Sequence, residues 1–164
     1  MATYTLISSV TVGSGGAASM EFTSIPATYT DLLVKFSQRA DSASASVYLE
    51  FNSSSSNLSN RRLYADGSGA YSFSGTDIIL YGNRSTWTAS TFSNVEIYVP
   101  NYASANYKSV SIDGVTENNA TLAEMSLTAG LWSNTAAITS LKLLAASGNF
   151  VQYSTAYLYG ISNA

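Results

Sequence analysis

The sequence predicts an all-β protein, an antiparallel β-sandwich of jelly-roll-like architecture with about nine or ten strands. Three observations indicate this class. Hydrophobic and polar side chains alternate with a period of two in several short segments, as they do in strands with one buried face. Turn sequences separate these segments at spacings of roughly 10 to 15 residues. No segment carries one long helical stripe of apolar residues, so a sandwich or barrel is favoured over a helical fold.

The strands are expected where apolar residues recur at every second position. The alternation is clearest at Leu32, Val34 and Phe36, and it recurs in the segments around Val47 and Val95. The complete set of expected strands is Thr3–Val12, Met20–Ile25, Leu32–Ser37, Val47–Phe51, Asp77–Tyr81, Val95–Val99, Tyr107–Ile112, Leu122–Leu127, Ile138–Ala145 and Thr155–Ile161.

Turns are expected where glycine supplies the positive φ that tight turns require. These sequences are Gly13–Gly16, Asp66–Gly67, Asp113–Gly114 and Ser147–Asn149. The serine cluster from Ser53 to Ser59 is expected to be a surface loop. Thr121–Leu131 fits a helical spacing as well as a period of two, and we favour a strand there.

The chain has 164 residues, which is long enough to bury a core without disulfides or metals. We expect one domain over residues 1–164, with a short N-terminal arm over about residues 1–6. The N-terminal sequence does not have the pattern of a signal peptide, and no window has the length of apolar sequence that a membrane helix needs. The sequence therefore predicts no membrane partner.

Composition excludes several classes of function. The chain has no histidine and no cysteine, so it can form neither a Ser-His-Asp triad, a thiol nucleophile nor a zinc finger. The acidic residues are spread singly, and no carboxylate pair stands out as a candidate for glycoside hydrolysis. Seven Lys and Arg against ten Asp and Glu, without a basic cluster, argue against nucleic-acid binding. We predict a protein that is not an enzyme, with no catalytic residue, metal or cofactor.

Aromatic residues are the main candidates for binding. Trp87 lies in a polar, turn-like stretch beside Asn83 and Arg84, and an exposed aromatic face flanked by polar donors is typical of a glycan site. Core packing or a subunit contact is the other interpretation, and we favour it for both Trp132 and Trp87. Tyrosine is enriched at protein interfaces, so Tyr102 and Tyr107 are candidates for subunit contacts.

Five segments carry a distinctive set of motifs. At the C-terminal end these are AGLWSNTAAITSLKLLAASGNF (residues 129–150) and AYLYGI (156–161). In the first part of the chain they are FTSIPATYTDLLVKFSQRAD (22–41), with its R-x-D-like end, and LEFNSSSSNLSNRRLYADGSGA (49–70), with its "FN" strand; the fifth is IYVPNYAS (97–104). Together they resemble a family of tailed-bacteriophage virion proteins, whose "I-x-I-PNY" segment residues 97–104 match. The likeness spans nearly the whole chain, but this chain has no fibre-forming repeat or coiled-coil stem.

The resemblance implies a place in the virion. The expected function is that of a capsid decoration, or cement, protein on the capsid surface, made in the cytoplasm of the bacterial host. Its expected partners are copies of itself in a homotrimer and the major capsid protein. A β-rich arm can add a strand to a neighbour's sheet, so the expected lattice or subunit contacts include the residues Ala2, Thr3, Tyr4, Thr5 and Leu6, besides Tyr102, Tyr107 and Trp132. The alternative is a tail or surface-exposed carbohydrate-binding module that recognises host glycans through Asn83, Arg84 and Trp87.

Overall fold

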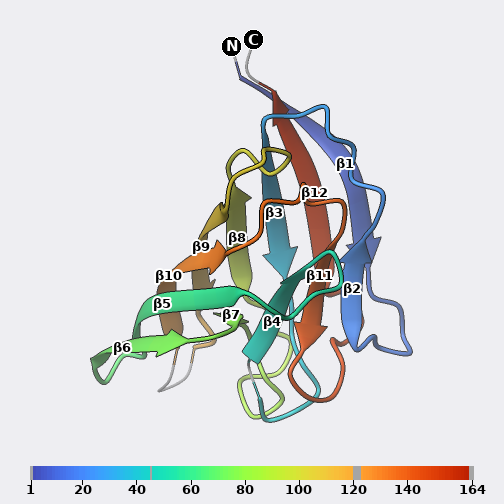
Figure 1. Cartoon of the computed structure of the whole chain (residues 1–164). Coiled ribbons are helices and arrows are strands. Elements are labelled where there is room, and N and C mark those ends of the chain that lie inside the picture. The colour runs from blue at the N-terminus through green and yellow to red at the C-terminus, as the bar shows by residue number, and fades with distance from the viewer. Residues whose placement is uncertain (1, 45, 120–122, 163–164) are drawn as a thin grey trace.

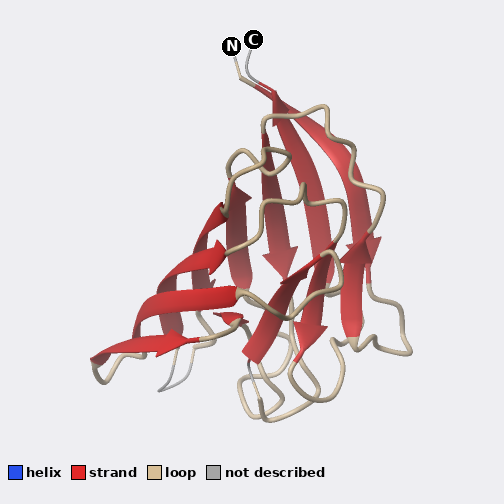
Figure 2. Cartoon of the chain, viewed as in Figure 1, coloured by secondary structure: helices blue, strands red, loops and turns tan. Residues whose placement is uncertain are grey.

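The structure, a computed structural model, describes residues 2–44, 46–119 and 123–162 and is all-β over these ranges (Figure 2). It contains twelve strands, more than the nine or ten expected. They are β1 (Thr3–Thr11), β2 (Ser19–Phe22), β3 (Asp31–Ser37), β4 (Ser46–Phe51), β5 (Leu58–Ala65), β6 (Ala70–Gly75), β7 (Ile78–Tyr81), β8 (Asn94–Val99), β9 (Lys108–Thr116), β10 (Glu124–Trp132), β11 (Leu141–Ala145) and β12 (Thr155–Ser162).

The strands form two antiparallel sheets (Figure 1). The small sheet has the order β2-β11-β4-β7, and the large sheet has the order β1-β12-β3-β8-β9-β10-β5-β6. The first four strands of the large sheet and the four of the small sheet have the connectivity of an eight-stranded jelly roll, in which the chain alternates between the two sheets. The expected jelly-roll-like sandwich is therefore confirmed.

Four strands extend the large sheet beyond this jelly roll. The hairpin β5–β6 is inserted between β4 and β7, and the hairpin β9–β10 is inserted between β8 and β11. The two hairpins lie side by side because β10 pairs with β5, for example Leu127 with Leu63. We call this extension the wing and define it as β9, β10, β5 and β6; its far edge projects past the small sheet in Figure 1.

The core lies between the two sheets of the jelly roll. Large aromatic side chains fill it, with Phe51 and Trp132 at a ring-centroid distance of 5.6 Å and Phe36 and Phe150 also at 5.6 Å, edge to face. Every second residue of β3 and β8, such as Val34 and Ile97, is fully buried. This is the burial that the period-two pattern predicts, and it fixes the register of the large sheet.

The expected free N-terminal arm is wrong. Thr3 to Leu6 belong to β1 and pair with β12 of the same chain, with Thr3 opposite Ser162. The reason is that β12 would otherwise present unpaired backbone groups at the edge of the sheet. The first and last strands, β1 and β12, consequently lie side by side (Figure 1).

Most turn predictions are confirmed. Gly16 has φ of 70°, Gly67 of 89° and Gly148 of 66°, as the turns at these places require. The turn expected at Asp113–Gly114 is wrong, because both residues lie within β9 and pair with β10. The segment that also fitted a helix is strand β10 from Glu124 onward, while residues 120–122 lie outside the described ranges.

Candidate interaction surface

The outer face of the wing, the side turned away from the small sheet, carries exposed apolar side chains. Leu63 of β5 is 63% exposed, Met125 and Leu127 of β10 are 61% and 57% exposed, and Val115 of β9 is 45% exposed. Register places them together, because Leu63 is opposite Leu127 and Val115 is opposite Met125. Residues that face each other across antiparallel strands share one side of the sheet. The four side chains therefore form one apolar cluster.

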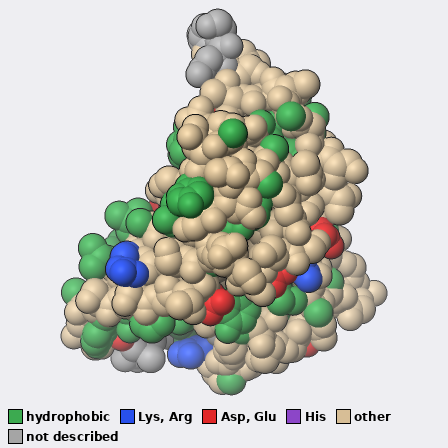
Figure 3. Space-filling view, viewed as in Figure 1, with side chains coloured by type: hydrophobic (Ala, Val, Ile, Leu, Met, Phe, Trp, Pro, Cys, Tyr) green, Lys and Arg blue, Asp and Glu red, His purple; other side chains and the backbone are tan. Residues whose placement is uncertain are grey.

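This cluster lines a hollow. Its volume is about 480 Å³, and its wall includes Leu63, Val115, Met125 and Leu127 with Ala65 and Tyr71. Hydrophobic side chains also gather at the end of the molecule where β5 and β6 lie (Figure 3). A contiguous apolar surface of this kind on a folded chain is typical of a site where another molecule binds.

The wing ends in an unprotected edge strand. β6 has the sequence AYSFSG, without charge or proline, and its Tyr71 and Phe73 are 44% and 48% exposed. Natural proteins usually guard such an edge with Lys, Pro or a bulge, because its free backbone groups can pair with another chain. The unguarded edge of β6 is thus continuous with a surface suited to protein contact.

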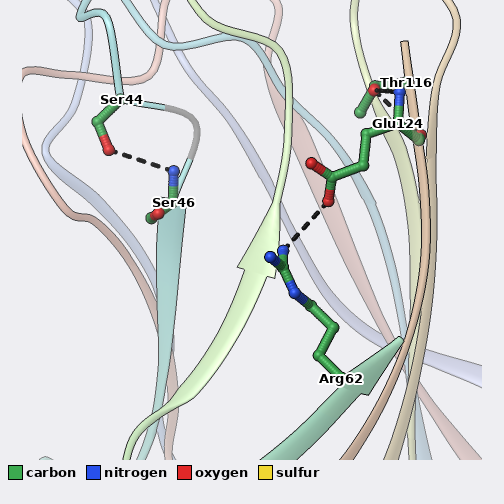
Figure 4. A network of polar contacts seen from close by, with 5 residues as sticks. All are labelled: Ser44, Ser46, Arg62, Thr116 and Glu124. Atoms are coloured by element: carbon green, nitrogen blue, oxygen red, sulfur yellow. Dashed lines mark hydrogen bonds and ion pairs between the residues drawn. The ribbon is translucent and has the colours of Figure 1, made fainter. Parts of the chain in front are cut away.

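The inner face of the wing is held by a buried arginine. Arg62 Nη1 lies 3.1 Å from Glu124 Oε1, and the guanidinium carbon lies 4.1 Å from the ring centroid of Tyr64 and 3.7 Å from that of Tyr81. Figure 4 shows the Glu124 side chain extending toward Arg62. The pair joins β5 to β10, and Tyr81 adds a contact from β7, so the cluster ties the wing to the jelly roll.

Burial governs the ionisation of Glu124. Removal from water raises the pKa of this carboxyl, and the positive charge of Arg62 opposes the increase. The backbone on either side is fixed as well, because Glu124 N–H donates to Thr116 Oγ1 at 2.8 Å. The charge of Asp66 adds to the increase and that of Arg84 opposes it. Because the Glu124 carboxylate is buried and engaged by Arg62, we assign it a structural role.

The opposite edge of the large sheet is also uncharged. β1 has the sequence TYTLISSVT, and Tyr4 and Leu6 are 61% and 51% exposed. A register shift between Leu6 and Ser8 is the one irregularity in its pairing with β12. The N-terminal residues expected to make contacts, Ala2, Thr3, Tyr4, Thr5 and Leu6, are all exposed, although they are reached as an edge strand and not as an arm.

Two of the expected contact residues belong to the core. Tyr102 is 0% exposed and its hydroxyl donates to the carbonyl of Pro26, and Trp132 is 1% exposed beside Phe51. A subunit contact is wrong for Tyr102, because the loop after β8 folds inward. For Trp132, which occupies an inward position of β10, the core-packing interpretation is confirmed and the subunit contact is wrong. Tyr107 is 60% exposed and stays a candidate for contact.

The residues expected to bind a glycan do not converge on an open site. Asn83 is 0% exposed, and its side-chain nitrogen donates to Thr91 Oγ1 at 2.7 Å, so the expectation is wrong for Asn83. The guanidinium carbon of Arg84 lies 4.9 Å from the ring centroid of Trp87 and occupies one face of that half-buried ring. A sugar would have to use what remains of the Trp87 surface.

The loop that holds Trp87 is organised by Arg39, the first residue of the R-x-D-like end. Its guanidinium donates to the carbonyl oxygens of Thr88 at 2.8 Å, Trp87 at 2.9 Å, and Ser85 and Thr91 at 3.3 Å each. Four backbone acceptors within one loop fix its path.

The other quoted motifs also have structural roles. Asp41 accepts from Asn149 N–H at 2.7 Å, and the PNY segment is anchored by Asn101 N–H, which donates to Asp31 at 2.8 Å. Asn52 of the "FN" strand accepts from Thr139 N–H at 2.8 Å. The motifs behind the resemblance thus specify the fold, and the outer face of the wing is a feature that sequence reasoning missed. The expected Asp66–Gly67 turn, which joins β5 to β6, was the sequence signal for a hairpin there.

The described residues include no group of three or more acidic side chains placed to hold a metal ion. They also include no helix long and apolar enough to cross a membrane. In comparisons with known proteins, no family model, no curated protein and no solved structure matches the chain.

Proposed function

We propose that this protein is a non-enzymatic structural component of a bacteriophage virion, a decoration protein that binds the major capsid lattice and stabilises the head. The observation that carries the proposal is that both edge strands of the large sheet, β1 and β6, are free of charge and proline, with Tyr4 and Leu6 exposed on β1 and the exposed apolar cluster beside β6. A surface of this kind is costly for an isolated chain and favourable once a protein covers it. The resemblance supplies the setting, a phage particle.

The mechanism is stabilisation by mass action. A protein that binds the assembled lattice and not the free capsid subunits shifts the equilibrium toward the assembled head. Its jelly roll serves as a rigid block, since paired strands and a filled core resist deformation. The proposal places the protein on the capsid surface as a homotrimer, with no nucleic acid, membrane or cofactor involved.

Edge strand β1 is the proposed contact with the lattice. Its exposed Tyr4 and Leu6 flank an edge free of charge and proline, to which a strand of the major capsid protein can be added. Deleting the first residues is a poor test, because Thr3 to Thr5 pair with β12 and their loss would expose that strand. Substitution by lysine, which natural edge strands use to prevent pairing, leaves the backbone intact.

The test is the stoichiometry and position of the chain in purified particles, measured by quantitative mass spectrometry and low-resolution imaging. We expect a high copy number distributed over the head. The variant Tyr4→Lys with Leu6→Lys should remain folded and lose head binding, while Tyr153→Lys, which changes an exposed tyrosine outside β1, should bind as the native chain does. A few copies located at the tail would contradict the proposal.

The carbohydrate-binding alternative has less support. Buried Asn83 and the partly covered ring of Trp87 leave few groups for a sugar. Tail location together with binding to host polysaccharide would favour it, and Trp87→Ala would then be expected to abolish that binding.

A further inference from the structure

We infer that the outer face of the wing is the surface through which copies of this chain bind one another. The inference deepens the proposed function and rests on it only for the setting, a homo-oligomer on a phage head. The surface itself is argued from the structure. The occupant that we infer is a second copy of the chain. Two features favour it: the opposite charges on either side of the apolar cluster, and the unguarded edge strand β6 next to that cluster.

Opposite charges flank the apolar cluster. Arg61 lies on β5, two positions before Leu63 on the same side of the strand, and Asp113 lies on β9 directly opposite Leu127. β10 separates the two strands, so the positive charge stands on one flank of the cluster and the negative charge on the other. Both side chains are exposed.

Neither charge has an ionic partner among the described residues. The ion pairs among the described residues are Lys35 with Glu96, Arg62 with Glu124 and Lys142 with Glu50. Glu96 is opposite Asp113 in the neighbouring strand β8, and Lys35 already engages it. Asp113 and Arg61 are therefore the outer-face charges on β5 and β9 that remain available to another molecule.

Symmetry makes this arrangement self-complementary. In a closed cyclic oligomer each copy contributes the same two flanks, so Arg61 of one copy can lie against Asp113 of the next while the apolar residues between them are buried together. A different protein would need an acidic group placed to meet Arg61 and a basic group placed to meet Asp113. A second copy of this chain already carries both groups. A nucleic acid or an anionic membrane would meet Asp113 unfavourably.

The edge of β6 agrees with an occupant that covers the wing. Tyr71 and Phe73 pair with Tyr64 and Arg62 and so lie on the inner face of the wing, while no charge or proline guards the backbone edge of this strand. A neighbouring copy seated on the outer face shields that edge from indiscriminate pairing with other chains.

The experiment measures the molar mass of the full chain by light scattering and sedimentation over a range of concentrations. We expect a closed oligomer for the native chain and a monomer for Leu127→Lys, since the change places a charge in the centre of the cluster. Tyr153→Lys is the matched control, because Tyr153 is 69% exposed and lies outside both β1 and the wing. It should associate as the native chain does.

Charge reversal tests the pairing without relying on Leu127. Arg61→Asp and Asp113→Arg should each weaken association at least about tenfold by bringing like charges together, and the double variant should restore it. A double variant as weak as either single one, or a native chain that stays monomeric, would overturn the inference.

The same variants separate this inference from the proposed function. A chain that associates through this face but does not bind heads supports the inference and contradicts the proposed function. A monomer that binds heads and loses binding on Leu127→Lys shows that capsid protein covers the face, which overturns the inference.

Discussion

Arg62 and Glu124 form an ion pair at 3.1 Å between neighbouring strands β5 and β10, and both side chains are largely buried. The pair lies on the inner face of the wing, opposite the exposed cluster of Leu63 and Leu127. The wing has no second sheet packed over its far part, so these polar and aromatic contacts hold it to the jelly roll. The outer face is left free for another molecule as a result.

We expect Glu124→Ala to destabilise the protein by about 3 kcal/mol. Loss of one member of a buried pair leaves the other charge without compensation, and here Arg62 would keep only the rings of Tyr64 and Tyr81. Urea unfolding measures the effect. Glu124→Gln, which retains an acceptor oxygen for Arg62, should lose less. Equal stability of the alanine variant and the native chain would contradict a role for the pair in holding the wing.

The pair should also leave a signature in the pH dependence of stability. Burial raises the pKa of Glu124 above the value of 4.5 expected for an exposed glutamate. At pH values between 4.5 and the raised pKa of the folded state, the folded chain binds the Glu124 proton more tightly than the unfolded chain does. The contribution of Glu124 to stability therefore decreases as pH rises through the folded pKa.

The comparison with Glu124→Gln isolates this contribution, because the amide does not titrate. We expect the unfolding free energy of the native chain, minus that of the variant, to fall as pH increases from 4.5 toward neutrality. Unfolding curves at a series of pH values measure the difference. A difference that is constant or that rises with pH would show that burial does not control this carboxyl.

Gly148 is expected to be irreplaceable by alanine. Its φ is 66°, and a β-carbon there would overlap the Asp41 carboxylate and lie 2.9 Å from the β-carbon of Ser42. We expect Gly148→Ala to cost about 2 kcal/mol from the backbone conformation and the displaced Asp41. Gly13→Ala is the matched control, since no atom lies within 4 Å of its added β-carbon. Similar thermal midpoints for the two variants would contradict the prediction.

The jelly roll could be predicted because its strands have one face in the core. In β8 the buried residues Val95 and Ile97 alternate with Asn94 and Glu96, so the pattern in the sequence is the pattern of burial. The strand β5 escaped prediction because its inward positions include Asn60 and Arg62. Their burial depends on the Asp77 carbonyl, just before β7, and on Glu124 of β10. When the residues at every second position are polar, the sequence gives no sign that they form the buried face of a strand.

The interaction surface could not be predicted for a related reason. In β10 the apolar residues Met125 and Leu127 face solvent, while Thr128 and Gly130 face inward. Hydrophobicity alone would place the side chains of Met125 and Leu127 on the buried face of the sheet, which is the wrong one. The opposite error affected Tyr102, whose hydroxyl suggested an interface but finds its acceptor, the Pro26 carbonyl, inside the molecule. Only the pairing of distant strands decides such cases.

Arg39 holds the loop that carries Trp87 in place. The guanidinium donates to four backbone carbonyls of residues 85–91. Hydrogen bonds to a charged donor contribute more than neutral ones, so Arg39→Met should destabilise the protein by about 2–3 kcal/mol. Arg39→Lys should recover little, because an ammonium group cannot span the four acceptors that the planar guanidinium reaches.

Limited proteolysis reads out the loop directly. We expect cleavage within residues 84–92 to become faster in Arg39→Met, while Lys35→Met, which removes an exposed cation from the nearby strand β3, leaves it unchanged. If the loop of Arg39→Met resists cleavage as the native loop does, its path is fixed by other contacts, such as that between Asn83 and Thr91. Faster cleavage with unchanged global stability would instead limit the role of Arg39 to the loop itself.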